Sequence, residues 1–380
     1  MNKAKALTSL LILLAIFSTS CSISNKSQKS VTTNKPVNIP ADIDKQKFGF
    51  LGSEEGMANV IKENGASWQR PHPGPFLWDS MQSEKDQEII FDKTDRIVTE
   101  AQEIKLGTLA TLWPFAEWDQ KRKPNADKYK VSENDEFMPN TKEGRGDYLP
   151  LHRSNPGDWQ AYEKWVKVVV ERYDGDGKQD MPGLEIPVKY WEVMNEPDLD
   201  SPEPDPRLDF YTEDATAYAS LLIKTSKAIK SADPDAKVLI AGAAGGNERF
   251  LSFYRGVFQN KETVSHFDIA NVHCISNDSH DSFNVEPYTK LLKSFGLNKS
   301  VWVTEAEAFI SDDPDINATQ TYESTKKALR LGAKKIFFTR YEFENMKMEQ
   351  PPMPDKQAPV KPTISGQNPT EAYRKITQLE

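Results

Sequence analysis

The chain has 380 residues, of which 37% are hydrophobic and 28% charged, with a formal net charge of −9 and two cysteines. Hydrophobic residues are spread along the chain, which excludes disorder throughout, and the length suits one large domain or two ordinary ones. The acidic balance argues against a nucleic-acid partner, because such a surface needs clustered Lys and Arg to neutralise phosphates. Two cysteines cannot build a disulfide framework.

The first twenty residues have the layout of a secretory signal. Lys3 and Lys5 precede the apolar run 10–17, and small residues occupy 18–20 directly before Cys21. The run is too short to span a bilayer comfortably. Small residues before a single cysteine also resemble a bacterial lipoprotein signal, which implies that Cys21 becomes a lipidated first residue. We therefore expect an exported protein of the cell envelope or surface, anchored to a membrane through Cys21; ordinary signal cleavage nearby is the alternative.

Residues 21–44 are rich in Ser, Asn, Lys and Thr and show no hydrophobic period. This composition predicts a flexible, extended tether. The predicted organisation is thus a signal peptide at 1–20, a tether at 21–44 and one folded domain at 45–380. Loss of the signal removes two lysines and no acidic residue, so the net charge becomes −11.

Short apolar runs alternate with helical periods throughout the folded domain. The predicted strands are 47–51, 66–70, 106–112, 188–194, 238–242, 267–273, 301–304 and 335–341. The predicted helices are 54–63, 84–104, 158–173, 213–231, 248–258, 286–295, 319–331 and 370–378. Eight strands and eight helices in strict order predict an α/β fold, a single (β/α)8 TIM barrel with a parallel sheet.

A doubly wound open sheet is the structural alternative. It is disfavoured because no Gly-x-Gly-x-x-Gly motif follows the first strand. The Gly- and Ala-rich stretch 241–246 follows the fifth strand instead, and we interpret it as a tight turn into a helix.

In a barrel of this type, chemistry occurs where the carboxyl ends of the strands meet. The fourth predicted strand ends in Asn195-Glu196-Pro197, and the seventh ends in Thr304-Glu305. The two glutamates would face each other across the barrel mouth. A facing pair of carboxyl groups is what cleavage of a glycosidic bond needs: a protonated acid for the leaving oxygen and an ionised nucleophile.

These motifs, together with the eight-unit order, resemble glycoside hydrolase clan A, the group that contains families 5 and 39. The resemblance implies that Glu196 is the general acid/base and Glu305 the nucleophile of a retaining mechanism. It also implies that Asn195 contacts the sugar 2-hydroxyl. Arg70, at the end of the second strand, matches the arginine of the clan, and its charge would help to keep Glu305 ionised.

Two further glutamates lie close to the candidate pair in sequence. Glu307 follows Glu305 by two positions and would point the same way in an extended chain. We favour Glu305 because it directly follows the apolar strand and Thr304. Glu192 precedes Glu196 by four residues, inside the barrel, where a buried charge needs a partner. The hypothesis is that Glu192 is a structural acid close to Arg70.

The sequence departs from the clan on the sixth and eighth strands. His273 matches a common histidine, either as a substrate contact or as a core residue, but Ile275 replaces the tyrosine often found two positions later. The tryptophan that often lines the sugar site on the eighth strand is absent, and Phe338, Arg340, Tyr341 and Phe343 stand there. Tyr341 is the expected replacement, because the C–H face of a sugar packs on any aromatic ring.

Aromatic residues also crowd the loops expected after the second and third strands, at the strand ends. Carbohydrate sites use such rings as stacking platforms, and Trp68 and Trp113 are the expected substrate contacts. The long polar segment 119–156 and the proline-rich segment 347–368 are expected to shape the cleft.

Asp174, Asp176 and Asp180 lie in a Gly-rich turn after the third helix. Their spacing resembles the short calcium loops of dockerin repeats, because a hard cation takes oxygen ligands from a tightly curved backbone. The alternative is a plain turn. Any calcium there is expected to be structural, since the loop precedes the fourth strand at the opposite rim from the glutamates.

The sequence therefore predicts a retaining glycosidase that hydrolyses a β-linked oligo- or polysaccharide and requires no cofactor. The alternative from another class is a non-catalytic carbohydrate-binding or adhesive lipoprotein on the same barrel. A metal-dependent hydrolase is poorly supported, because the five histidines form no close ligand pair at a strand end.

Overall fold

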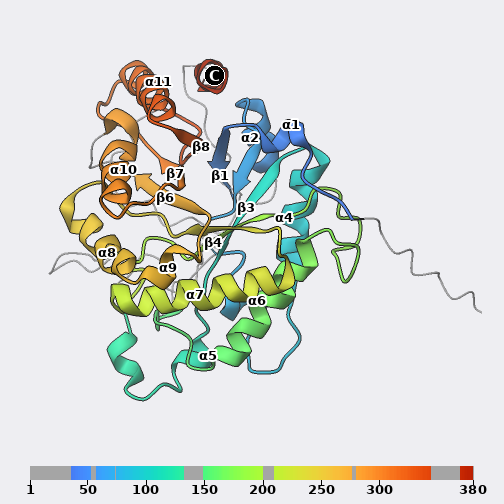
Figure 1. The fold of residues 1–380 in the computed structure, drawn as a ribbon. Helices are drawn as coiled ribbons and strands as arrows, with labels where there is room; N and C mark the ends of the chain where they lie inside the picture. Colours follow the sequence, from blue (N-terminus) through green and yellow to red (C-terminus); the bar gives the residue numbers. More distant parts are fainter. Residues whose placement is uncertain are drawn as a thin grey trace, which may run out of the picture. The chain divides into compact units, whose positions relative to one another are not determined.

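The computed structural model describes residues 36–52, 57–72, 74–131, 149–199, 209–275, 280–343 and 369–379. In this part of the chain eight parallel strands form a closed barrel in the order β1 to β8, and β8 pairs back with β1 (Figure 1). The prediction of a single (β/α)8 barrel is confirmed. The predicted signal peptide, Cys21 and residues 21–35 lie outside the described residues.

The strands begin and end within a few residues of the apolar runs that predicted them. They are β1 (Phe48–Leu51), β2 (Trp68–Arg70), β3 (Gly107–Leu112), β4 (Tyr190–Val193), β5 (Lys237–Ile240), β6 (Ile269–Cys274), β7 (Ser300–Ala306) and β8 (Ala333–Phe338). Nearly continuous apolar runs are typical of parallel strands, because both faces of the sheet are covered.

One helix of seven residues or more follows each strand. These are α2 (Met57–Glu63), α4 (Asp92–Glu103), α6 (Trp159–Tyr173), α7 (Ala215–Ala232), α8 (Glu248–Gln259), α10 (Val285–Ser294), α11 (Pro314–Arg330) and α12 (Pro369–Thr377). Short helical turns occur at α1 (Ala41–Asp44), α3 (Trp78–Met81), α5 (Glu117–Gln120), α9 (Lys261–Val264), η1 (Ala126–Tyr129) and η2 (His280–Ser282). None of the helices within the described ranges is long and apolar enough to cross a membrane.

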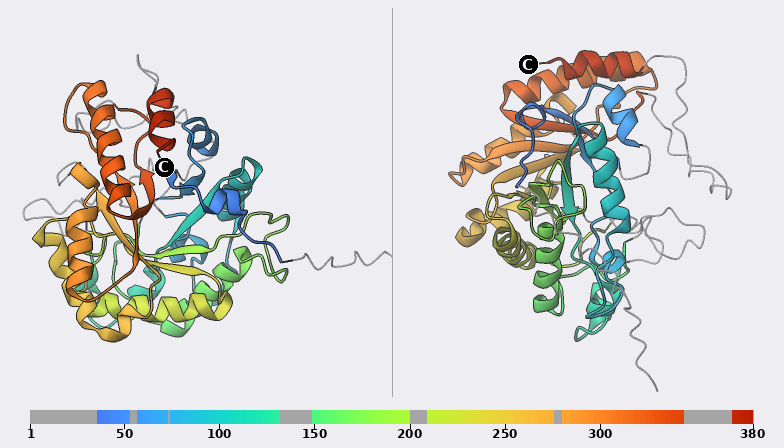
Figure 2. Two further views of the ribbon diagram at one scale, coloured as in Figure 1. Left: turned by 45° about the horizontal axis from the view of Figure 1, so that its top comes forward. Right: turned by 90° about the vertical axis from the view of Figure 1, so that its right-hand side faces the viewer.

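The last helix closes the ring of helices. Figures 1 and 2 show α12 beside α11 and next to the N-terminal units of the barrel. The ring of Tyr373 packs edge-on against Phe50 of β1 at 4.8 Å. Arg374 donates a hydrogen bond to the backbone oxygen of Glu63, at the end of α2. These contacts join the first and last βα units.

The prediction of a flexible tether is wrong for residues 36–44, which pack on the barrel. Ile43 of α1 is 3% exposed. Its backbone oxygen accepts a hydrogen bond from the Trp68 ring nitrogen at 3.1 Å. Val37 donates from its backbone to Gly175 at 2.7 Å. The segment folds onto the domain because Ile39 and Ile43 supply apolar contacts that its polar composition conceals.

A small apolar cluster fills the N-terminal end of the barrel and is separate from the main core between strands and helices. It contains Ile43, Trp68, Leu109, Ile186, Leu239, Ile269, Trp302 and Phe337. Lys335 is also buried there, with its ammonium 4.1 Å from the Trp68 ring centre and donating to two backbone oxygens of the 44–46 segment. The cluster closes this end of the barrel, so that the polar interior lies toward the carboxyl ends of the strands.

Candidate active site

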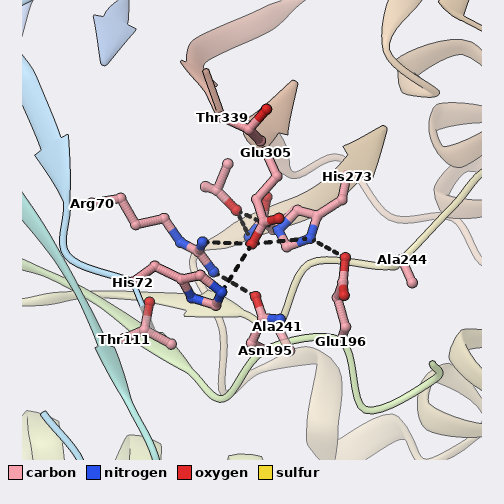
Figure 3. Close-up of polar contacts among 12 residues, drawn as sticks. Arg70, His72, Thr111, Asn195, Glu196, Ala241, Ala244, His273, Glu305 and Thr339 are labelled. Carbon is pink, nitrogen blue, oxygen red and sulfur yellow. Dashed lines mark hydrogen bonds and ion pairs between the residues drawn. The ribbon is translucent and has the colours of Figure 1, made fainter. Parts of the chain in front are cut away.

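Four strands bring their polar residues together at the carboxyl end of the barrel. Arg70 ends β2, Asn195 and Glu196 follow β4, His273 lies in β6, and Glu305 lies in β7. Figure 3 shows these side chains converging on one point above the strands. The register between β6 and β7 shifts after Val272, and this irregularity pairs His273 directly with Glu305. The predicted arrangement of the two glutamates across the barrel mouth is therefore present.

Arg70 is the centre of this cluster and is completely buried. Its guanidinium donates to Glu192 at 2.8 Å, to Glu305 at 2.7 Å and to the Asn195 side-chain oxygen at 2.6 Å. Burial alone would lower the pKa of Arg70, but the charges of Glu192 and Glu305 outweigh that effect and raise it. A permanent positive charge is thus fixed between two carboxylates.

Glu192 has the structural surroundings that were expected of it. Besides Arg70, its oxygens accept hydrogen bonds from Thr111 at 2.6 Å, Asn271 at 2.5 Å and Thr304 at 3.2 Å. Its side chain is fully buried, and all four of these donors are protein groups. The carboxylate therefore has no lone pair left for a substrate, and its place is to hold Arg70.

Glu196 lies on a strained turn. Its φ is 40° and that of Met194 is 71°, both in the left-handed region that residues other than glycine rarely adopt. This turn brings a Glu196 carboxyl oxygen within 2.7 Å of His273 Nδ1. Burial raises the pKa of Glu196 to about 8, although the charge of Arg70 acts in the opposite direction. Glu196 is therefore mainly protonated at neutral pH.

Glu305 lies opposite, and its surroundings differ from those of Glu196. One of its oxygens accepts from Arg70 and lies 3.6 Å from His72 Nε2 and 3.7 Å from His273 Nδ1. Burial raises the pKa of Glu305 above its ordinary value, although the charges of His273 and Arg70 act in the opposite direction. A carboxyl oxygen of Glu305 lies within 4.8 Å of one from Glu196. One carboxyl group is thus bonded to a cation and the other to a neutral ring.

The neighbouring Glu307 does not face the cluster. Its carboxylate accepts from Thr339 at 2.5 Å and pairs with Arg340 at 3.0 Å. These bonds turn Glu307 toward β8. The choice of Glu305 over Glu307 as the residue facing Glu196 agrees with this geometry.

Two histidines complete the site. His273 is buried, with Nδ1 bonded to Glu196 and Nε2 2.8 Å from Thr304 Oγ1. Burial lowers the pKa of His273 to about 4 and that of His72 well below its ordinary value, so both rings are neutral. Both nitrogens of His273 are thus engaged in hydrogen bonds. His72 was missed from the sequence, although its position two residues after Arg70 is the spacing that places it on the same face.

The predicted aromatic contacts are mostly not stacking surfaces. The prediction for Trp68 is wrong: it begins β2, so its side chain lies in the apolar cluster at the opposite end of the barrel. Trp113 lies at the correct end, 5.6 Å from the His72 ring, but is completely buried. Tyr341 is partly exposed and stacks on Phe50 at 5.0 Å. Ile275 after β6 is 36% exposed.

The three aspartates of the candidate calcium loop do lie together. One oxygen from each of Asp174, Asp176 and Asp180 lies within 4.8 Å of the others. The loop joins α6 to β4, at the opposite rim from the glutamates. Burial raises the pKa of Asp174 to about 7. Backbone amides of the loop already donate to all three carboxylates, which is also the geometry of a plain turn.

Comparison with family models and with curated proteins gave no match. Among solved structures, the chain is similar to a glucosidase from Croceicoccus marinus, with a TM-score of 0.54 and 16% identity over 82% of this chain and 62% of that protein. A family 39 glycoside hydrolase from Bacteroides cellulosilyticus WH2 gives a TM-score of 0.50 and 14% identity over 78% and 57%. Xylanase 10B from Thermotoga petrophila RKU-1, in complex with xylobiose, gives a TM-score of 0.50 and 17% identity over 79% of this chain and 83% of that protein.

The chain spans less than two thirds of the length of the first two proteins. At these identities the similarity establishes a shared fold. The (β/α)8 barrel of this chain is thus of the kind found in glycoside hydrolases.

The buried acid predicts a pH-dependent stability difference between the protein and a Glu196→Gln variant. A carboxyl group whose pKa is raised on folding favours the folded state fully below its unfolded pKa, and this contribution is lost as the pH rises to about 8. Glutamine does not titrate. The variant should therefore gain stability relative to the native protein between pH 4.5 and pH 8, by up to about 5 kcal/mol. Denaturant unfolding across this range measures the difference, and a constant difference would contradict the protonated state of Glu196.

Proposed function

We propose that the protein is a retaining glycosidase that hydrolyses O-glycosidic bonds in a β-linked oligo- or polysaccharide. The observation that carries the proposal is the pair Glu196 and Glu305, whose carboxyl oxygens approach within 4.8 Å at the barrel mouth. Retaining glycosidases hold their carboxyl groups about 5–5.5 Å apart, whereas inverting enzymes leave about 6.5–9.5 Å for a water molecule. The short separation favours the double-displacement mechanism.

The mechanism requires an ionised nucleophile and a protonated acid. Glu305, bonded to Arg70, attacks the anomeric carbon and forms a glycosyl–enzyme ester. Glu196, protonated at neutral pH, gives its proton to the leaving oxygen. In the second step the Glu196 carboxylate takes a proton from water, and the resulting nucleophile displaces Glu305 from the sugar.

Two groups beside the pair are suited to bind the sugar. The side-chain nitrogen of Asn195 is buried beside Glu196, while its oxygen is fixed by Arg70. A buried amide donor next to the acid is placed to donate to a sugar hydroxyl. His72, which follows β2, points its Nε2 toward the Glu305 carboxyl group (Figure 3). The xylobiose bound to the similar xylanase is a ligand of this chemical class.

The proposal predicts turnover of some aryl β-glycosides and its loss in two variants. Glu196→Gln removes the acid and should lower kcat/KM by roughly 10²–10⁴-fold. Glu305→Gln removes the nucleophile and should lower it at least as far. Product formation measures the rates, and proton NMR of the first product should show the β-anomer before mutarotation. Formation of the α-anomer first would exclude retention.

Glu307→Gln is the matched control for these two variants. Glu307 lies two residues from Glu305 and is equally buried, but its partners are Thr339 and Arg340. This variant should keep its activity. Turnover that survives in both the Glu196→Gln and Glu305→Gln variants would refute the assignment.

A non-catalytic carbohydrate-binding or adhesive surface lipoprotein remains the second candidate. It is favoured by the changed strand ends: Ile275 is exposed after β6, and Arg340 at the end of β8 is tied to Glu307. A glycan bound without turnover by both the native protein and the Glu196→Gln variant would support this candidate.

The calcium site remains a prediction. Three converging carboxylates, one of them buried, fit an oxygen-ligated cation near Gly175, where the N-terminal segment also attaches through Val37. Addition of a chelator should lower the melting temperature and leave the turnover of the folded protein unchanged. Asp176→Asn should reduce this effect. A melting curve that does not respond to chelator or to added calcium would refute the calcium site.

Lipid attachment at Cys21 and export are also proposals, supported by the order of basic, apolar and small residues before this cysteine. The native protein expressed with its signal should partition into the detergent phase, and Cys21→Ser should partition into the aqueous phase. Aqueous partitioning of the native protein would point to ordinary signal cleavage.

A further inference from the structure

We propose that Glu192 and Thr304 fix the tautomer of His273, so that its unprotonated Nδ1 accepts a hydrogen bond from the protonated carboxyl group of Glu196. This inference rests on the proposed function and adds two positioning residues to it. It follows from counting hydrogens along a buried chain of contacts that runs from Glu192 through Thr304 and His273 to Glu196.

This series of hydrogen bonds begins at Glu192, which accepts hydrogen bonds. Glu192 forms an ion pair with Arg70 and also receives donors on both oxygens. Thr304 Oγ1 lies 3.2 Å from Glu192 Oε1. A carboxylate has no proton to give. The favourable arrangement therefore has the Thr304 hydroxyl donating to Glu192.

The Thr304 hydroxyl has a single proton, which it donates to Glu192. The other two groups in contact with Thr304 Oγ1 must therefore donate to it. The amide nitrogen of Asn271 donates to Thr304 Oγ1 at 2.6 Å. The remaining contact, 2.8 Å to His273 Nε2, is a hydrogen bond only if Nε2 carries a proton. The opposite arrangement, with Thr304 donating to Nε2, leaves two oxygen lone pairs facing each other between Thr304 and Glu192 in a completely buried region.

The ring is neutral, so a proton on Nε2 leaves Nδ1 bare. Nδ1 lies 2.7 Å from a Glu196 oxygen, and only a protonated carboxyl group can donate to it. A hydrogen bond to the neutral form of an acid raises its pKa. This agrees with the burial that raises the pKa of Glu196 to about 8 and lowers that of His273 to about 4.

The charges around the pair are compatible with this state. The titratable and charged groups that act on Glu196 and His273 come from β2, β4, β7 and the segments that follow β2 and β4; they are Arg70, His72, Glu192, Asp198 and Glu305. Two carboxylates already lie beside the single cation Arg70. A third ionised carboxylate would repel both. The hydrogen-bond series and the charge balance therefore both favour a protonated Glu196.

The test is the pH–rate profile of Thr304→Val, which keeps the shape of the side chain and removes the hydroxyl. Without Thr304 Oγ1 nothing requires a proton on Nε2, and the tautomer with Nδ1–H stabilises ionised Glu196. The basic limb of kcat/KM should move to lower pH by about one unit. Thr304→Ser keeps the hydroxyl and should keep the native profile.

Thr111→Val is the matched control. It removes a buried hydroxyl bond from the other oxygen of the same Glu192, away from His273. It should lower the melting temperature as Thr304→Val does, without moving the basic limb. An unmoved limb in Thr304→Val, or an equal shift in Thr111→Val, would overturn the proposal.

A second measurement does not depend on glycosidase activity. In protein labelled with ¹⁵N-histidine, the His273 signals can be assigned by their loss in His273→Gln. The native protein should show a protonated Nε2 and an unprotonated Nδ1, and Thr304→Val should populate the other tautomer. A protonated Nδ1 in the native protein would refute the proposed hydrogen-bond series, even if the enzyme is active. If the expected tautomer is found in a protein without turnover, the hydrogen-bond series is supported and the proposed function is refuted.

Discussion

The whole site depends on one completely buried guanidinium. Arg70 places a permanent charge inside the barrel, and such a charge is tolerated only where carboxylates and further hydrogen bonds replace water. Glu192 and Glu305 supply the two carboxylates, and Asn195 supplies a third acceptor. Because two anions already surround one cation, another ionised carboxylate is unfavourable. Glu196 and Glu305 are equally buried, and burial raises the pKa of both, but of the two it is Glu305 that is bonded to this cation.

The two ends of the barrel differ in their contribution to stability. At the N-terminal end, the apolar cluster around Trp68, Trp302 and Phe337 contributes burial without any polar requirement, and residues 36–44 cover it. At the carboxyl end, the backbone is strained at Met194 and Glu196. Left-handed conformations at such residues cost about 1–3 kcal/mol each. The packed end therefore stabilises a domain whose other end carries strain and buried charge.

The architecture could be predicted from the sequence because apolar runs and helical periods alternate without interruption. Glu196 and Glu305 could be found because each directly follows such a run. The location of Trp68 could not be inferred from proximity to a strand, because that requires knowing which end of the strand it occupies. The packing of Ile43 was concealed by the polar composition around it. Asn271 gave no signal, and Thr304 was noticed only as the neighbour of Glu305, since polar residues inside predicted strands acquire a role only when neighbouring strands bring them together.

The composition of the site also distinguishes between the two candidate functions. Three buried carboxyl groups, those of Glu192, Glu196 and Glu305, lie around the guanidinium of Arg70. Glycoside cleavage passes through a transition state with positive character on the sugar, which a preorganised site rich in carboxyl oxygens stabilises more than it stabilises the neutral substrate. A site that only binds a neutral sugar gains nothing from three buried carboxyl groups or from a strained backbone at Glu196. The cost of maintaining both is understandable if the bound sugar becomes positively charged.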